Sequence, residues 1–158
     1  EGSKKFSEKL FRIAVAKPNT GPGVFMSAGP SSGKSTFING LLAEQIRTSD
    51  FVVDGVFDKF DKSVEKIEAT LASGRDVIIN HIFLPVEEAA ARAVARATDA
   101  NGDITGRLPD ANTLTGDHVR SQINFLALYE KYKNNPNVHF FVGDNSTGTP
   151  YIIPSKEA

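Results

Sequence analysis

The sequence predicts an α/β fold, a three-layer α/β/α sandwich with a small, mostly parallel central sheet. Short apolar runs rich in β-branched residues alternate along the chain with segments whose apolar residues recur at helical spacing. Strands joined through helices pair in parallel by right-handed crossovers, with helices on both faces of the sheet. A glycine-bounded loop between residues 28 and 33 joins the first core strand to a helix, which narrows the fold class to the P-loop NTPases.

The first twenty residues are predicted to form a helix and a connector. Phe6, Leu10 and Ile13 recur at helical spacing in a Lys/Glu background, and the proline- and glycine-rich run 17–23 ends the pattern. We expect residues 1–20 to precede the core of one domain that spans residues 1–158.

The P-loop is the most specific motif in the chain. It reads Val-Phe-Met-Ser-Ala-Gly-Pro-Ser-Ser-Gly-Lys-Ser-Thr over 24–36, a strand followed by the loop and by a helix to about Arg47. Ala28 replaces the first glycine of the strict motif, and this is tolerated because that residue belongs to the strand end. Lys34 is predicted to reach the β/γ-phosphates of a nucleoside triphosphate and Ser35 to ligate Mg²⁺. The predicted nucleotide-binding residues are Gly29, Pro30, Ser31, Ser32, Gly33, Lys34, Ser35 and Thr36.

Two strands and a helix follow. Residues 50–54 read as a short strand that ends at Asp54, and 75–83 as a strand buried on both faces. Between them, Ser73 and Gly74 end a helix in the manner of a C-cap. Its single apolar stripe consists of Phe60, Val64, Ile67 and Leu71.

The second half of the chain continues the alternation. Pro85 precedes a helix from Val86 to about Thr98, and the turn-rich segment 99–116 is predicted to be a lid loop. A helix to about Lys133 and a last core strand over 137–142 complete the pattern, with a terminal loop over 143–148.

Composition excludes several classes of protein. The chain has 158 residues, of which 40% are hydrophobic and 23% charged, a composition typical of globular proteins. It contains no cysteine, so disulfides and thiolate metal ligands are ruled out. The absence of cysteine also fits a reducing, cytoplasmic setting. No apolar run approaches the length of a membrane span, and no signal peptide precedes the first element. The net charge of −1 does not favour binding to nucleic acid. Because the chain begins at Glu1, we expect a domain of a larger protein.

Asp54 is the first candidate for chemistry outside the P-loop. Ligands of parallel α/β sheets bind at the carboxyl ends of the strands, where the P-loop, Asp54 and the turn 144–146 are expected to meet. Asp54 is interpreted either as an acid on the magnesium side or as the base that accepts the proton of an attacking hydroxyl. A solvated aspartate at a strand end is the alternative, and Asp58 or Asp61 could supply the base instead.

Arginines on and after the helix 86–98 fit a lid that stabilises the charge of phosphoryl transfer. Arg96 and Arg107 are the preferred pair. Arg92 fits the lid no better than it fits an exposed helix surface, where it would pair with Glu88 or with water. The guanine-reading motif Asn-Lys-x-Asp is not present in the sequence, so a GTPase is disfavoured. The three histidines do not have the spacing of metal ligands, so a zinc site is not indicated.

Together these motifs resemble the zeta-toxin family of P-loop kinases, closest to the zeta-like modules of large phage and mobile-element proteins. The motifs that carry the resemblance are the P-loop, Phe-Val-Val-Asp54, Ala69-Thr-Leu-Ala-Ser-Gly-Arg-Asp-Val77, Leu84-Pro85-Val-Glu-Glu-Ala89, Arg96-Ala97 with Gly106-Arg107-Leu-Pro109, and Asp144-Asn145-Ser146.

The resemblance implies a kinase that uses ATP and Mg²⁺ to phosphorylate a hydroxyl of a small molecule, such as the sugar of a nucleotide-sugar. It implies that Lys34 and Ser35 bind phosphate and magnesium, that Arg96 and Arg107 serve the lid, and that Asn145 belongs to the nucleotide site. Zeta toxins carry an additional strand with an aspartate base after the P-loop helix, for which this chain has too few residues. Asp54 is therefore expected to be an acid on the magnesium side, with no separate base present and with a reduced substrate pocket, and it is counted as both a metal ligand and a catalytic residue.

Three functions remain open at this stage. The first is a small-molecule kinase of toxin type, with an antitoxin or other domains of a larger chain as partners, acting in the cytoplasm of a bacterium or of a host cell. The second is a nucleotide-binding or NTP-hydrolysing regulatory module. The third is a nucleic-acid end kinase, which would require a basic channel that the net charge of −1 does not indicate.

Overall fold

The computed structural model describes residues 2–28, 33–54, 59–98, 111–146 and 151–154. The helices are α1 (Gly2–Ala16), α2 (Lys34–Asn39), α3 (Ala43–Thr48), α4 (Phe60–Ala72), α5 (Val86–Thr98) and α6 (Ala111–Tyr132). The strands are β1 (Gly23–Ala28), β2 (Phe51–Asp54), β3 (Val77–Phe83), β4 (Val138–Asp144) and β5 (Tyr151–Pro154).

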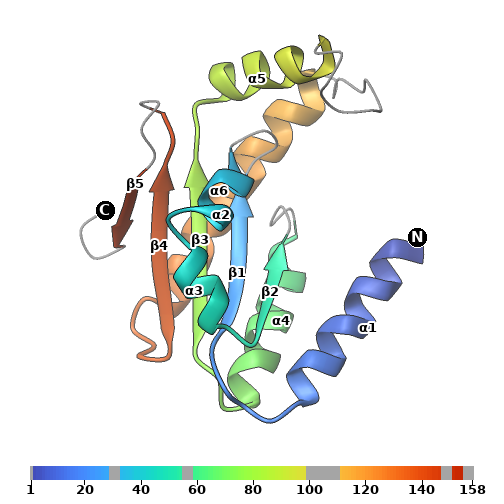
Figure 1. Ribbon diagram of the computed structural model, residues 1–158, viewed down its shortest axis with the longest axis vertical. Coiled ribbons are helices and arrows are strands. Elements are labelled where there is room, and N and C mark those ends of the chain that lie inside the picture. Colours follow the sequence, from blue (N-terminus) through green and yellow to red (C-terminus); the bar gives the residue numbers. More distant parts are fainter. Residues whose placement is uncertain (1, 29–32, 55–58, 99–110, 147–150, 155–158) are drawn as a thin grey trace.

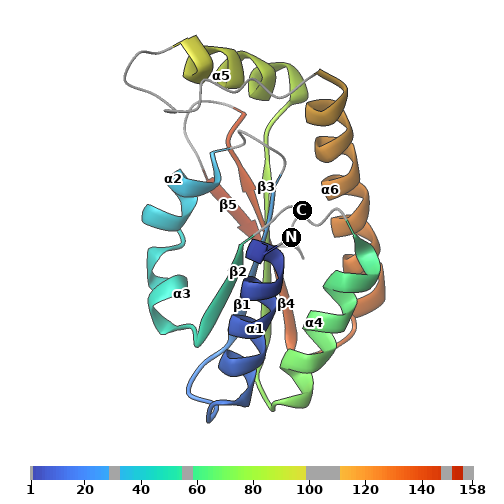
Figure 2. The same ribbon diagram turned by 90° about the vertical axis from the view of Figure 1, so that its right-hand side faces the viewer.

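The strands form one sheet in the order β2-β1-β3-β4-β5 (Figure 1). The first four strands are parallel, and β5 pairs antiparallel with β4. Helices α2 and α3 lie on one face, and α4 and α6 lie on the other (Figure 2). The predicted three-layer α/β/α fold is confirmed.

β1 is the centre of the domain. All six of its residues are buried, and it pairs with both β2 and β3, so that Gly23 is opposite Phe51 and Val77. Alternate side chains of β1 enter the two apolar layers of the core, because successive residues of a strand point to opposite faces. Phe25 packs with α4 and α6, and Met26 packs with α2.

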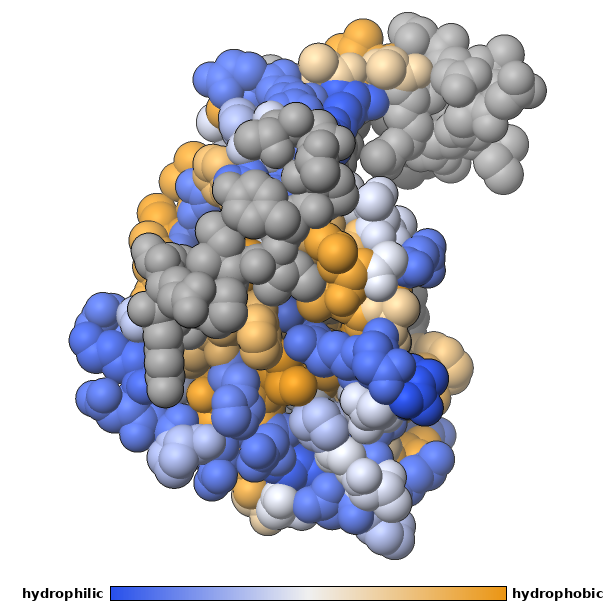
Figure 3. Space-filling view, turned by 60° about the vertical axis from the view of Figure 1, so that its left-hand side comes forward, coloured by the Kyte–Doolittle hydropathy of each residue, from blue (hydrophilic) through white to orange (hydrophobic). Residues whose placement is uncertain are grey.

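The carboxyl ends of the parallel strands all face the same way, and α5 crosses over them in both views (Figures 1 and 2). In the face drawn in Figure 3, hydrophilic residues cover much of the lower part and hydrophobic residues gather at mid-height. No helix among the described residues is long and apolar enough to cross a membrane.

Helix boundaries agree with the sequence analysis where the end signals are strong. α4 spans Phe60–Ala72, and Gly74 follows its C-cap Ser73 with a φ of 83°, a conformation that glycine adopts without strain. α5 begins directly after Pro85, as expected.

Four local expectations are wrong. The helix after the P-loop does not run on to Arg47, because Gly40 leaves the helical conformation and separates α2 from α3. α6 begins at Ala111, so the part of the predicted lid loop at 111–116 is helical, despite the unfavourable helix propensity of Gly116. β5 was not expected, and β4 extends to Asp144 rather than ending at 142.

A buried arginine holds α1 to the base of the sheet. Arg75 is 2% exposed, and its Nε donates to Asp50 Oδ2 at 2.7 Å. Its two terminal nitrogens donate to the carbonyl oxygens of Val15 (3.0 Å) and Lys17 (2.7 Å), which no longer have helical partners at the end of α1. Hydrogen bonds from Thr20, and then from Arg75, hold the pKa of Asp50 well below its usual range.

Replacing Arg75 by methionine should therefore destabilise the domain strongly. The variant removes the partner of a buried carboxylate, and breaking a buried pair typically costs about 3–5 kcal/mol. Urea unfolding measures the effect. As a matched control, Arg47→Met breaks an exposed ion pair with Glu44 and should cost below about 1 kcal/mol. Equal losses in the two variants would contradict the role given to Arg75.

Candidate functional site

The carboxyl end of the sheet brings together three segments that are far apart in the sequence. Lys34 begins α2, Asp54 ends β2, and Asn145 follows β4. The parallel pairing of β1 with β2 and β3, and of β3 with β4, places these ends at the same edge. The expected gathering of the P-loop, Asp54 and the Asp-Asn-Ser turn is confirmed for the part of the chain that the structure describes.

Lys34 and Asp54 form an ion pair between Nζ and Oδ1. The side chains are 26% and 50% exposed, so water screens the pair and its net contribution to stability is small. Each partner is thus able to exchange the other for a ligand at low energetic cost. A cation at the start of the P-loop helix suits an anionic ligand, and the carboxylate beside it suits a metal ion or a proton.

Gly33 is the close-packed point of the site. Its φ is 85°, in the left-handed region, and it is the N-cap of α2 without a side-chain capping bond. A Cβ on this residue would lie 2.2 Å from Nδ2 of Asn145 and 3.3 Å from Nη1 of Arg92. Only glycine satisfies both the conformation and the space, so Asn145 and Arg92 lie directly over the last glycine of the P-loop.

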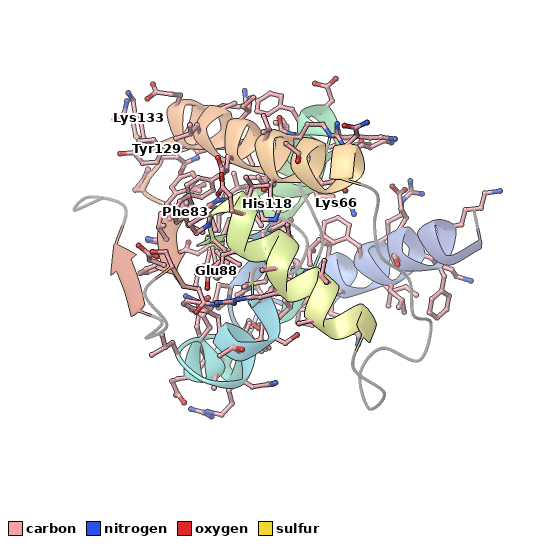
Figure 4. The ribbon with its side chains drawn as sticks, turned by 90° about the horizontal axis from the view of Figure 1, so that it is seen from above. Lys66, Phe83, Glu88, His118, Tyr129 and Lys133 are labelled. Atoms are coloured by element: carbon pink, nitrogen blue, oxygen red, sulfur yellow. The ribbon has the colours of Figure 1, made fainter. Side chains whose placement is uncertain are left out.

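Arg92 reaches this point from α5. Its Nη2 donates to Glu88 Oε1 at 2.6 Å, one helical turn away, and the same nitrogen lies 3.5 Å from the carbonyl oxygen of Asn145. Figure 4 looks down on this end of the sheet and shows Glu88 on α5, which crosses over α2. Sequence reasoning ranked Arg92 below Arg96 and Arg107, since a pair spaced i,i+4 with Glu88 gives no indication that the helix lies over the P-loop.

The turn after β4 is held by its own polar groups. The main-chain N–H of Asn145 donates to the carbonyl oxygen of Phe83 at 3.1 Å. Oδ1 of Asp144 accepts hydrogen bonds from the N–H (2.8 Å) and the hydroxyl (2.6 Å) of Ser146. Asn145 is only 6% exposed. Its amide is therefore fixed in position over Gly33.

The structure does not test the roles predicted for several site residues, and some of these residues lie outside the described part of the chain. Ser35 and Thr36 are exposed in the first turn of α2. Arg96 belongs to α5, but its side chain is not among those described. Arg107 and the predicted nucleotide-binding residues 29–32 lie outside the described residues. Their roles stay predictions.

The described residues contain no cluster of three or more His, Cys, Asp or Glu side chains able to hold a metal ion. The residues at the site nevertheless fit Mg²⁺, which keeps several waters and takes one or two protein ligands in addition to phosphate oxygens. The Ser35 hydroxyl and the Asp54 carboxylate are hard oxygen donors of that kind. Bound there, the ion would neutralise phosphate charge.

A buried polar pair lies near the carboxyl end of β1, and sequence reasoning did not find it. The Ser27 hydroxyl and Nδ1 of His81 lie 3.0 Å apart and share a hydrogen bond between β1 and β3. The imidazole stacks on Phe125 of α6 with ring centroids 4.7 Å apart. Burial, and then the nearby His118, lower the pKa of His81 to about 4. His81 is therefore neutral at pH 7 and part of the packing that supports the end of β1.

No family model matches this chain, and neither does any curated protein. Solved structures do match: chains from crystal structures of the AvrRxo1-ORF1:AvrRxo1-ORF2 complex in its native form, with sulphate ions and with ATP. Each is 12% identical, with TM-scores of 0.64, 0.65 and 0.64, and the match covers 96% of this chain. The chain spans 66% of the length of those chains. At this identity the likeness shows the fold alone.

Stability should fall in mild acid because of His81. The unfolded histidine binds a proton near pH 6.5, whereas the folded one does so only near pH 4. The unfolded state thus binds more protons between these values, and the free energy of unfolding decreases by up to about 3 kcal/mol as pH falls from 6.5 to 4.

Denaturant unfolding of His81→Gln across this pH range measures the effect. The variant should lose that part of the pH dependence, while His139→Gln, which removes a histidine whose side chain is 47% exposed, should keep it. If the wild type and His81→Gln show the same slope, His81 is not buried in its neutral form.

Proposed function

We propose that this chain is an ATP- and Mg²⁺-dependent kinase of the zeta-toxin type, which transfers the γ-phosphate of ATP to a hydroxyl of a small molecule such as a nucleotide-sugar. The proposal takes residues 1–158 as one kinase domain. The observation that carries it is the contact between the P-loop lysine Lys34 and Asp54, at the carboxyl end of a parallel sheet.

In this proposal Lys34 exchanges its ion pair with Asp54 for the β/γ-phosphates. The exchange is inexpensive because the pair is partly exposed. The main chain of the P-loop up to Gly33 and the residues Ser35 and Thr36 complete the phosphate site. Ser35 and Asp54 hold Mg²⁺, which supplies charge neutralisation at the phosphates.

Asp54 is also the proposed acceptor of the proton. In the transfer, a bond forms between the acceptor oxygen and the γ-phosphorus, the bond from that phosphorus to the β,γ-bridging oxygen breaks, and the hydroxyl proton leaves for a base. A carboxylate beside the P-loop lysine is close to where that hydroxyl must be. Its 50% exposure leaves room for an acceptor molecule.

Arginines from α5 and the segment after it are the proposed stabilisers of the transferring group. Arg92 is held by Glu88 beside Gly33, so it can contact phosphate without a large movement. Arg96 and Arg107 would act from the lid. Guanidinium groups suit this role because negative charge spreads over the equatorial oxygens during transfer.

The comparisons support parts of this proposal. One of the similar structures is a complex with ATP, and another contains sulphate ions, which is consistent with an anion-binding site on this fold. All three are complexes between two proteins. This chain is accordingly proposed to have a protein partner of antitoxin type.

Phosphorus NMR of the protein with MgATP and a metabolite extract that includes nucleotide-sugars tests the kinase. We expect a new phosphomonoester signal with the wild type and none with Lys34→Ala. Asp54→Asn and Arg92→Gln should lower the rate at least tenfold, a typical loss for such groups. Lys133→Ala, directly after the C-terminal end of α6, is the control and should retain the wild-type rate.

Two other outcomes would overturn the proposal. Free phosphate alone, in a reaction that depends on Lys34, would indicate an NTP-hydrolysing module. Unchanged ATP in every mixture would leave a nucleotide-binding domain without transfer activity.

A further inference from the structure

A groove lies between α1 and β2. Its volume is about 400 Å³, within the range of small-molecule sites. α1 lies beside β2 at the side of the sheet away from β4 (Figures 1 and 2). Residues of α1 line the groove together with all four residues of β2, and Lys66 of α4 contributes a cation. The groove therefore extends along β2 to Asp54, the last residue of the strand.

Asp54 belongs both to the groove and to the candidate site. Its Oδ1 pairs with Nζ of Lys34 at the start of the P-loop helix, and the same residue lines the groove. Val52 also lines the groove, and it is on the same side of the strand as Asp54 because the two are separated by one residue. A molecule in the groove can thus place one of its groups at Asp54, beside Lys34, and the rest against β2 and α1.

The walls of the groove are largely apolar. Leu10 of α1 and Val52 of β2 line it with side chains that are 50% and 36% exposed. Phe11 also lines the groove, and its ring is held by an edge-on contact with Phe51, with ring centroids 5.6 Å apart. Sites for organic ligands consist mainly of apolar and aromatic side chains with a few polar groups. These walls suit a ring of an organic ligand.

Lys66 supplies a positive charge within the groove. Its Nζ lies 5.7 Å from the centre of the Phe11 ring. No carboxylate among the described residues forms an ion pair with Lys66, whereas Lys62, on the same helix, pairs with Glu65. A lysine ammonium without an acid partner is available to an anionic group of a ligand.

We propose that the groove between α1 and β2 is the acceptor site of the kinase, and that its acceptor is an alcohol that carries a ring and an anionic group, as a nucleotide does. The ring packs against Leu10 and Phe11, the anionic group pairs with Lys66, and the hydroxyl lies at Asp54. The inference rests on the proposed function for its chemical step. In that step the hydroxyl oxygen bonds to the γ-phosphorus, ADP leaves with the electrons of the broken bond, and the proton passes to Asp54.

The same observations disfavour two simpler occupants. An inorganic anion would pair with Lys66 but would leave the exposed side chain of Leu10 uncovered. An uncharged apolar molecule would cover Leu10 but would take the Lys66 ammonium out of water without giving it a partner, which is costly. A ring that carries an anionic group satisfies both walls of the groove and its charge.

Binding of uridine monophosphate, followed by methyl NMR, tests the site without turnover. The base of this nucleotide differs from that of ATP, and MgADP in excess occupies the P-loop. We expect uridine monophosphate to shift the methyl signals of Leu10 and Val52. The methyl signals of Leu126, a leucine that is 61% exposed on α6, should not move. Absence of any shift at Leu10 and Val52 would overturn the proposal.

Two lysine variants test the anionic group. Lys66→Gln should weaken the binding of uridine monophosphate roughly tenfold, the loss expected for one charge-assisted contact. Lys62→Gln is the matched control, because Lys62 is on the same helix but does not line this groove, and it should bind as the wild type does. Uridine, which lacks the phosphate, should bind the wild type and Lys66→Gln alike. Equal affinity of the wild type and Lys66→Gln for uridine monophosphate would overturn the proposal.

A leucine variant tests the apolar wall. Leu10→Ser should weaken the binding of uridine and of uridine monophosphate by a similar factor, roughly tenfold, because it removes apolar contact with the ring. Leu126→Ser removes a similarly exposed leucine from α6 and should leave both affinities unchanged. If Leu10→Ser binds both molecules as the wild type does, the ring does not lie in the groove and the proposal is wrong.

Transfer activity separates this inference from the proposed function. Uridine monophosphate added to the metabolite extract should slow the formation of phosphomonoesters by the wild type, because it occupies the acceptor site. If it binds in the groove without slowing transfer, the acceptor binds elsewhere, which overturns the inference and leaves the proposed function intact. If the wild type forms no phosphomonoester although uridine monophosphate binds in a manner that depends on Lys66, the proposed function is overturned, and with it the acceptor role of the groove.

Discussion

The pairing of β1 between β2 and β3 is the constraint on which the rest of the molecule depends. β1 is buried along its whole length, so both of its edges must be hydrogen-bonded and both of its faces covered. The parallel neighbours β2 and β3 hydrogen-bond to the two edges of β1, and the helices that connect the strands cover both faces. The same arrangement brings the end of β2, the start of α2 and the turn after β4 to one side, which gives the site its composition.

The site has a rigid, closely packed part and an adjustable part that consists of an ion pair. The rigid part consists of Gly33, Asn145 and the Arg92–Glu88 pair, since a side chain on Gly33 would collide with the asparagine amide. The adjustable part is the partly exposed contact between Lys34 and Asp54. The rigid part is already formed, and the Lys34–Asp54 ion pair is easily exchanged. Such a site suits an anionic ligand that binds together with a cation. The buried Ser27–His81 hydrogen bond joins the end of β1 to β3.

Much of the fold and of the site could be predicted from the sequence, because it depends on short motifs. The strand–loop–helix of the P-loop, the position of Asp54 at a strand end, and the limits of α4 and α5 all depend on residues close together in the chain. The position of Arg92 could not be predicted, because its contact with Gly33 requires α5 to cross the sheet end. The early start of α6 and the short strand β5 likewise depend on tertiary packing that overrides local propensity. The break at Gly40, in contrast, agrees with the poor helix propensity of glycine.

Titration calorimetry with MgATP is the first measurement to make, because the proposed function requires a nucleotide site at Lys34 and its neighbours. We expect saturable binding to the wild type and a loss of affinity of at least tenfold in Lys34→Ala, while Lys62→Ala, which breaks an exposed pair with Glu65 on α4, binds as the wild type does. Equal affinity of Lys34→Ala and wild type for MgATP would show that Lys34 is not part of a nucleotide site.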